Sequence, residues 1–277
     1  MRTGFSSSSK LVKSEILNIH VDSVSSHTSL CMALLPDGED ELLFLQNNVG
    51  NSIQVYSLNE RKLLKTILIP QSGPASISQI HGFTVINKDS IFVYDYFTLW
   101  NTLLINFDGN IIGTLKILHP RTGRAFNHFS LTPCPIIFNK GTLYIKEIPL
   151  DIGLPNPNLY SSGYKLEYSY NLLTSELKSE DITWPVEYHG NDYWIHMNKY
   201  YKARGESGIM VYSWQASDSI IVTDFKTVKR KYFAGSRYFK KGIKPNSINS
   251  NKNEECHYIE SDQYSIIAYD KYRNLYY

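Results

Sequence analysis

Two arginines and two histidines lie close together in the segment HPRTGRAFNHF, residues 119–129. A guanidinium group donates paired hydrogen bonds to carboxylates and phosphates, so Arg121 and Arg124, flanked by His119 and His128, form a candidate anion-binding site. The alternative is a solvated basic loop, because connecting segments are ordinarily polar and exposed. We favour the loop and keep the four residues as candidate ligand-binding residues.

A second candidate is the aromatic segment YHGNDYWIH, residues 188–196. His189, Asp192 and His196 have side chains that bind metals or transfer protons, and Trp194 offers a surface on which a sugar ring can stack. The spacing between the histidines is not a standard metal-ligand spacing, and no second carboxylate is near. We therefore predict no metal, no cofactor and no catalytic residue here, and a packed loop with surface histidines is the main alternative.

The most basic part of the chain is KTVKRKYFAGSRYFKKGIK, residues 226–244. Interleaved basic and aromatic residues are typical of proteins that bind single-stranded nucleic acid. Residues 228–233, however, have the pattern of an outer strand, where lysine discourages pairing with other chains. Because the net charge is only +2, we predict no nucleic-acid partner.

The composition favours β-structure. Of 277 residues, 42% are hydrophobic and 21 are tyrosines, which suit pleated, half-buried surfaces. The three cysteines, Cys31, Cys134 and Cys256, match no zinc or redox motif. The sequence has no glycine-rich phosphate loop, nucleophile elbow or HExxH motif, and no apolar run long enough for a transmembrane helix.

A repeated set of strands predicts the architecture that positions these residues. Successive sets begin with apolar runs around Leu42, Ile91, Leu143, Ile209 and Ile266. Repeats of about 40–50 residues with four strands each are the signature of propeller blades. Residues 82–87 and 134–139 supply inner strands for the second and third sets. We therefore predict an all-β fold, a β-propeller of four-stranded antiparallel blades with four complete blades and part of a fifth.

Turn residues support this prediction. Asp108-Gly109 predicts a two-residue hairpin with a type I′ turn. The segments NKDS, residues 87–90, and NKGT, residues 139–142, occupy matching positions after the two inner strands. The alternative is a β-sandwich, which also has short strands at regular spacing but does not usually repeat a four-strand unit.

The repeat is interrupted by three expected loops, residues 149–163, 184–204 and 234–256. Because the last apolar run reaches Tyr277 without a final strand, we predict a C-terminally truncated propeller, with a ring of five blades as the alternative. Residues 14–24 are a candidate strand that closes the ring. We expect a flexible serine-containing linker at residues 1–13 and one propeller domain at residues 14–277.

The segments DELLFLQNNVGNSIQVYSLNERKLLKTILI, IHGFTVINKDSIFVYD and SIIAYDKYRNLYY resemble a family of bacterial propeller-like lipoproteins known only as a domain of unknown function. The resemblance implies a propeller of six or seven blades, exported and lipid-anchored behind a short linker. The family has no established catalytic residues that could be assigned to positions of this sequence. This sequence lacks the lipobox cysteine, so membrane association would depend on an anchor that the chain does not contain.

We therefore expect a non-catalytic, exported propeller of the cell envelope (periplasm or outer membrane) that binds an unknown small molecule, glycan or protein at its channel face. One alternative is a propeller hydrolase, either metal-dependent and lactonase-like or glycan-cleaving. The inner strands at residues 82–87 and 134–139 contain no Asp, Glu or His, which weighs against it. A second alternative is a protein-interaction scaffold, and a cytoplasmic location is the alternative to export.

Overall fold

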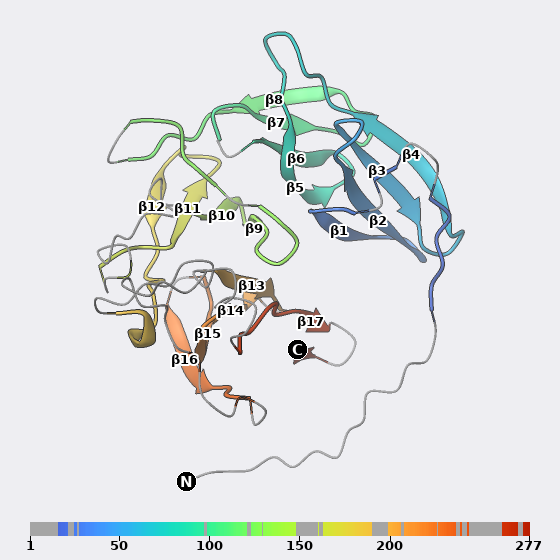
Figure 1. The fold of residues 1–277 in the computed structure, drawn as a ribbon. Coiled ribbons are helices and arrows are strands. Elements are labelled where there is room, and N and C mark those ends of the chain that lie inside the picture. The colour runs from blue at the N-terminus through green and yellow to red at the C-terminus, as the bar shows by residue number, and fades with distance from the viewer. Residues whose placement is uncertain are drawn as a thin grey trace, which may run out of the picture.

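Four antiparallel sheets of four strands each form a four-bladed β-propeller (Figure 1). This computed structural model describes residues 16–21, 25–26, 28–96, 99–120, 123–128, 130–147, 160, 163–189, 199–205, 208–225, 227–236, 239, 243, 262–270 and 274–277. The strand order in each sheet follows the chain, so every blade is a simple meander. The predicted fold class is confirmed.

The first two blades contain the first eight strands. Blade 1 consists of β1 (Met32–Asp37), β2 (Asp40–Asn47), β3 (Ser52–Ser57) and β4 (Lys62–Leu68). Blade 2 consists of β5 (Ile80–Asn87), β6 (Ser90–Asp95), β7 (Thr102–Ile105) and β8 (Ile111–Leu115).

The next two blades continue around the ring. Blade 3 consists of β9 (Ile137–Asn139), β10 (Thr142–Lys146), β11 (Glu167–Asn171) and β12 (Leu177–Ser179). A short 3-10 helix, η2 (Val186–Tyr188), precedes blade 4. Blade 4 consists of β13 (Tyr200–Arg204), β14 (Met210–Trp214), β15 (Ser217–Thr223) and β16 (Val228–Phe233).

Consecutive blades bury a hydrophobic cluster between their faces. All side chains of β3 and β14 are buried, because strands in the middle of a blade are covered on both faces. The clusters include Phe44, Val55 and Val93 between blades 1 and 2, Tyr94, Leu143 and Ile145 between blades 2 and 3, and Tyr200, Tyr212 and Trp214 between blades 3 and 4. This packing holds the inner strands β1, β5, β9 and β13 around the axis of the ring (Figure 1).

The C-terminal part of the predicted fifth unit forms only a small ribbon. It pairs β17 (Tyr269–Asp270) with β18 (Leu275–Tyr276). Ile267 packs with Tyr201 and Val211 on the face of blade 4 that is turned away from blade 3. The ribbon therefore extends the radial stacking beyond blade 4.

Two predictions about strands were wrong. Tyr200–Arg204 was placed in a loop, but it is β13, the innermost strand of blade 4. The sequence YYKAR carries a buried lysine in its centre, which disguised the apolar pattern. Residues 14–24 were predicted to be a strand, yet the described residues 16–21 have no strand structure.

The turn at Asp108-Gly109 also differs from the prediction. A type I′ turn requires positive φ at both central residues, but only Gly109, at φ +85°, has it. The Asn106 side chain accepts hydrogen bonds from the amides of Asp108 at 3.1 Å and Asn110 at 2.9 Å. These bonds stabilise a longer loop. The turn at Lys140-Gly141, in contrast, has positive φ at both residues.

Candidate functional site

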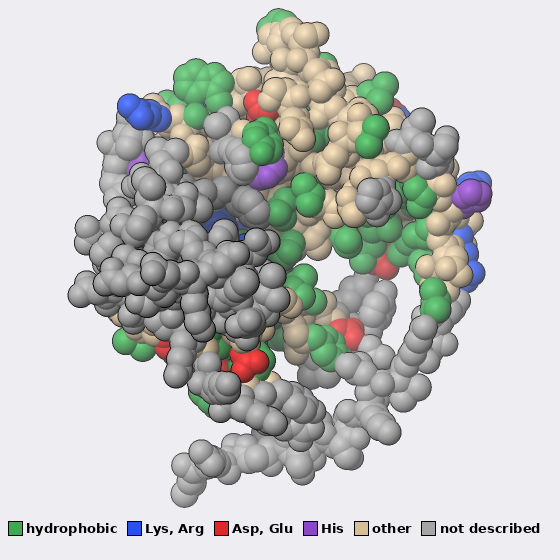
Figure 2. Space-filling view, in the orientation of Figure 1, with side chains coloured by type: hydrophobic (Ala, Val, Ile, Leu, Met, Phe, Trp, Pro, Cys, Tyr) green, Lys and Arg blue, Asp and Glu red, His purple; other side chains and the backbone are tan. Residues whose placement is uncertain are grey.

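The inner strands surround a cavity of about 660 Å³ in the middle of the ring. Its lining comes from β1, β5, β9 and the last residue of β13, so all four blades contribute. Hydrophobic side chains border the central hollow in Figure 2. The volume lies within the range of about 300–1,000 Å³ that is typical of small-molecule sites.

Most of the cavity wall is apolar. Leu34, Phe83, Ile86, Ile136 and Phe138 supply much of it. Leu34 belongs to β1, Phe83 and Ile86 to β5, and Phe138 to β9, so three inner strands supply this wall.

One polar side chain of the wall, Thr84, already has its partners. The Thr84 hydroxyl donates to the carbonyl of Ile136 at 2.7 Å and accepts from the Tyr94 hydroxyl at 2.8 Å. Burial raises the pKa of Tyr94, so this phenol stays neutral and keeps its proton for the bond. The Thr84 hydroxyl is therefore engaged within the wall.

The charged residues of the described lining are both cations and lie at one end. Arg204 is the last residue of β13, and Lys140 follows the last residue of β9. The Arg204 Nη1 atom donates to the carbonyl of Phe138 at 2.7 Å, which ties blade 4 to blade 3 across the edge of the cavity. Both side chains are exposed.

Residues 130–136, which we call the bridging segment, turn into the middle of the ring just before β9 (Figure 1), and Pro135 and Ile136 are part of the cavity lining. Thr132 Oγ1 accepts from the Met32 amide at 3.0 Å, and the Thr132 amide donates to Leu30 O at 3.0 Å. The amide of Lys202 donates to Pro133 O at 3.2 Å. The segment thus joins blades 1 and 4 to blade 3, and the exposed side chains of Lys140 and Arg204 lie at the other end of the lining.

One glycine makes the contact with blade 2 possible. Gly82 has φ +114°, and a Cβ atom built on it would lie 2.1 Å from Ser130 O. Ser130 Oγ in turn accepts from the Ile136 amide at 3.1 Å. Only a residue without a side chain lets the bridging segment approach β5 this closely.

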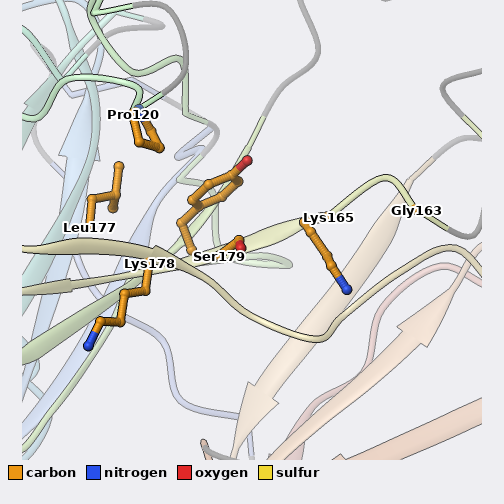
Figure 3. Close-up of a pocket in the computed structure, with 7 residues that line it drawn as sticks. Pro120, Gly163, Lys165, Leu177, Lys178 and Ser179 are labelled. Carbon is orange, nitrogen blue, oxygen red and sulfur yellow. The ribbon is translucent and has the colours of Figure 1, made fainter.

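A second hollow, of about 530 Å³, lies on the outer part of blade 3 (Figure 3). Pro120, Tyr168, Lys165 and Lys178 are among its lining residues, and the two ammonium groups point away from one another (Figure 3). Lys165 pairs with Asp181 at 2.7 Å and Lys178 with Glu176 at 3.0 Å. With both cations already paired, we consider it a weaker site than the central cavity.

The first predicted site is divided by the structure. His119 Nε2 lies 2.9 Å from Glu147 Oε1 and stacks on Phe126, and His128 is fully buried with Nε2 3.0 Å from Asp95 O. These histidines therefore hold blade 2 against blade 3. Arg124 is exposed and lies on a turn. The carbonyl of Arg124 accepts a hydrogen bond from the amide of His119. Arg121 lies outside the described residues, so the predicted pair of guanidinium groups stays a prediction.

The second predicted site is described only at its beginning. His189 is half-buried after η2, and its Nε2 lies 3.0 Å from Trp184 O. Asp192, Trp194 and His196 lie outside the described residues, so the metal and glycan interpretations are untested. In the basic stretch, residues 228–233 form β16, the outer strand of blade 4, as predicted.

Comparison with known proteins assigns the chain to a family. The profile described as "Domain of unknown function (DUF4221)" matches residues 8–277. The chain belongs to the DUF4221 family. No curated protein sequence matches it.

The chain is similar to solved structures to different degrees. A DUF4221 member from Bacteroides vulgatus is similar to this chain with a TM-score of 0.81 and 22% identity, over 96% of this chain and 75% of that one. A putative exported protein from Bacteroides fragilis gives a TM-score of 0.47 and 13% identity, over 76% and 52% of the two chains. Virginiamycin B lyase from Staphylococcus aureus gives 0.42 and 14%, over 79% and 58%. The similarity to the Bacteroides vulgatus protein concerns the fold alone.

The DUF4221 chain also contains a buried ion pair that sequence reasoning missed. Lys202 Nζ contacts Glu167 Oε1, and neither side chain is exposed. Lys202 Nζ also donates to Tyr144 O at 3.0 Å, and the Tyr200 hydroxyl lies 2.8 Å from Glu167 Oε2. Burial and the charge of Glu167 raise the pKa of Tyr200. This network lies between blades 3 and 4, behind the cavity wall.

Two further findings apply to the part of the chain that the structure describes. Within it, no group of three His, Cys, Asp or Glu side chains is arranged to hold a metal ion. In the same part of the chain, no helix is long and apolar enough to cross a membrane. Cys31 and Cys134 are buried free thiols, and burial raises the pKa of Cys31 to about 12.

Proposed function

We propose that this DUF4221 protein is a non-catalytic binding protein that holds a small, largely apolar ligand in the central cavity. The observation that carries the proposal is the apolar cavity of about 660 Å³ to which every blade contributes. Transfer of apolar surface from water into such a cavity is favourable by about 25 cal/mol per Å². A site assembled from four blades also accounts for the absence of a local sequence motif.

The hydrolase alternative has less support. It needs acidic and histidine side chains at the cavity, whereas the charged residues of the described lining are Lys140 and Arg204. A glycan or a protein partner stays a prediction.

The variant Leu34→Glu tests the proposal. Leu34 lines the cavity and is 54% exposed, so a carboxylate there is compatible with folding but opposes an apolar ligand. We expect the uncharged fluorescent probe N-phenyl-1-naphthylamine to bind the wild-type protein saturably with one site. In Leu34→Glu, we expect at least about tenfold weaker binding, as for the loss of roughly 1.4 kcal/mol.

The matched control is Leu64→Glu. Leu64 is 43% exposed on β4 and is not part of the cavity lining. We expect it to bind the probe like the wild type. If the wild type shows no saturable binding, or if both variants lose the same affinity, the cavity is not the binding site.

We also propose that the protein acts in the cell envelope, since the sequence resembles exported lipoproteins. We expect fractionation of cells that make the native gene product to place it with the envelope, and globomycin to block its lipid attachment. A native product found only in the cytoplasm contradicts this proposal and leaves the cavity proposal unaffected.

A further inference from the structure

We propose that the ligand is an amphiphilic anion, with its apolar body in the cavity and its anionic group held by Arg204 and Lys140. This inference rests on the proposed function and specifies the class of ligand. It follows from the position of the charges, the orientation of Arg204 and the residues at the other end of the cavity lining.

Both charged residues of the described cavity lining are cations, and both lie at the same end of the cavity. Lys140 and Arg204 come from blades 3 and 4 and lie where β9 and β13 end. At the neighbouring turns of blades 1 and 2, Lys88 Nζ pairs with Asp37 Oδ2 at 2.7 Å, so these two charges neutralise one another. The pair of cations at this end therefore favours an anionic group.

Arg204 is oriented for this role. Its hydrogen bond of 2.7 Å to Phe138 O uses one of the five N–H donors of a guanidinium group. The bond holds the group beside β9. Because a guanidinium fork matches the two oxygens of a carboxylate, the remaining donors are suited to bind one.

The other end of the lining determines which way the ligand lies. The bridging segment supplies Pro135 and Ile136 there, and the nearby Thr84 hydroxyl is already bonded to Ile136 O. A carboxylate placed there would lose hydration beside Pro135 and Ile136, which is costly, and the Thr84 hydroxyl already has two partners. The anionic group therefore lies at the end of Arg204, and the apolar chain points toward the bridging segment.

The depth of the cavity indicates a suitable probe. Residues 135–139 run along its wall, with residues 137–139 in β9, and five residues span at most about 16 Å at about 3.3 Å each. An extended aliphatic chain of about a dozen carbons has a similar length, so dodecanoate is the probe of choice. Dodecanol and dodecyltrimethylammonium have the same chain with no charge and with a positive charge.

The experiment is displacement of bound N-phenyl-1-naphthylamine by these three compounds below their micellar concentrations. We expect dodecanoate to displace the probe from the wild type, and dodecyltrimethylammonium to be at least about tenfold weaker. In Arg204→Gln, we expect dodecanoate to bind about tenfold more weakly, as for the loss of a charge-assisted bond, and dodecanol to change less than about twofold.

The controls separate this inference from the proposed function. Lys178→Gln removes an exposed cation outside the cavity and should change nothing. Lys140→Gln gives a second variant if Arg204→Gln does not fold. If Arg204→Gln weakens the binding of dodecanoate and dodecanol equally, the inference that the ligand is an anion is wrong. It is also wrong if dodecyltrimethylammonium displaces the probe as well as dodecanoate does. In both cases, binding of the probe to the wild type still supports the proposed cavity. Absence of probe binding to the wild type overturns both.

Discussion

Replacing Lys202 with methionine is expected to lower the free energy of unfolding by about 3–5 kcal/mol, the range for breaking a buried ion pair from one side. Lys202 and Glu167 are completely buried, and among the described residues the substitution leaves the Glu167 carboxylate with the Tyr200 hydroxyl at 2.8 Å. Water cannot replace the lost ammonium group without opening the interface between blades 3 and 4. Urea unfolding followed by tryptophan fluorescence measures the change, since Trp214 is buried in the same cluster.

Two further variants show whether charge is the cause. In Lys202→Met with Glu167→Leu both charges are absent, and we expect the double variant to be more stable than Lys202→Met alone. Lys178→Met removes an exposed lysine that pairs with Glu176, and we expect a change below about 1 kcal/mol. The interpretation is wrong if Lys202→Met is within about 1 kcal/mol of the wild type.

The second large effect is expected for Gly82→Ala. The new Cβ atom would lie 2.1 Å from Ser130 O and 2.8 Å from Ser130 Cβ, and alanine is strained at φ +114°. Strain contributes about 1–3 kcal/mol, and the backbone shift needed to relieve the overlap adds about 1–3 kcal/mol. We expect a loss of about 2–6 kcal/mol in the free energy of unfolding, together with weaker binding of the probe because the bridging segment moves.

Gly73→Ala is the matched control. Gly73 has a similar φ of +103°, but nothing lies within 4 Å of the position of its Cβ atom. It therefore reports the conformational strain alone, about 1–3 kcal/mol. Equal losses in the two variants would show that the contact with Ser130 does not matter.

The strands were largely predictable because blades are local structures. The alternation of apolar residues and the matching turns after residues 87 and 139 reflect contacts between residues that are close in the sequence. Such contacts leave a recognisable sequence pattern. β13 was missed because its centre carries Lys202, whose charge is compensated by a residue of another blade. An ion pair between strands 35 residues apart leaves no local signal.

The candidate site was predicted less well for the same reason. His119 and His128 have side chains that suggest chemistry, yet their environment makes them part of the packing between blades 2 and 3. Arg204 and Lys140 were not singled out as a site, because their significance comes from meeting at one end of a cavity. The sequence predicted a site at the channel face in general terms, but the residues that line the cavity depend on tertiary structure.

The bridging segment has a consequence for how the protein comes apart. In modular folds each unit touches only the units beside it, so melting can begin at either end and spread stepwise. Here Thr132 bonds to a carbonyl 102 positions away, at Leu30, and Pro133 bonds to Lys202. This cross-brace couples modules that are not adjacent, so the end modules cannot peel away one at a time. The whole ring is thereby expected to melt in a single all-or-none transition, with the brace among the last contacts to form during folding.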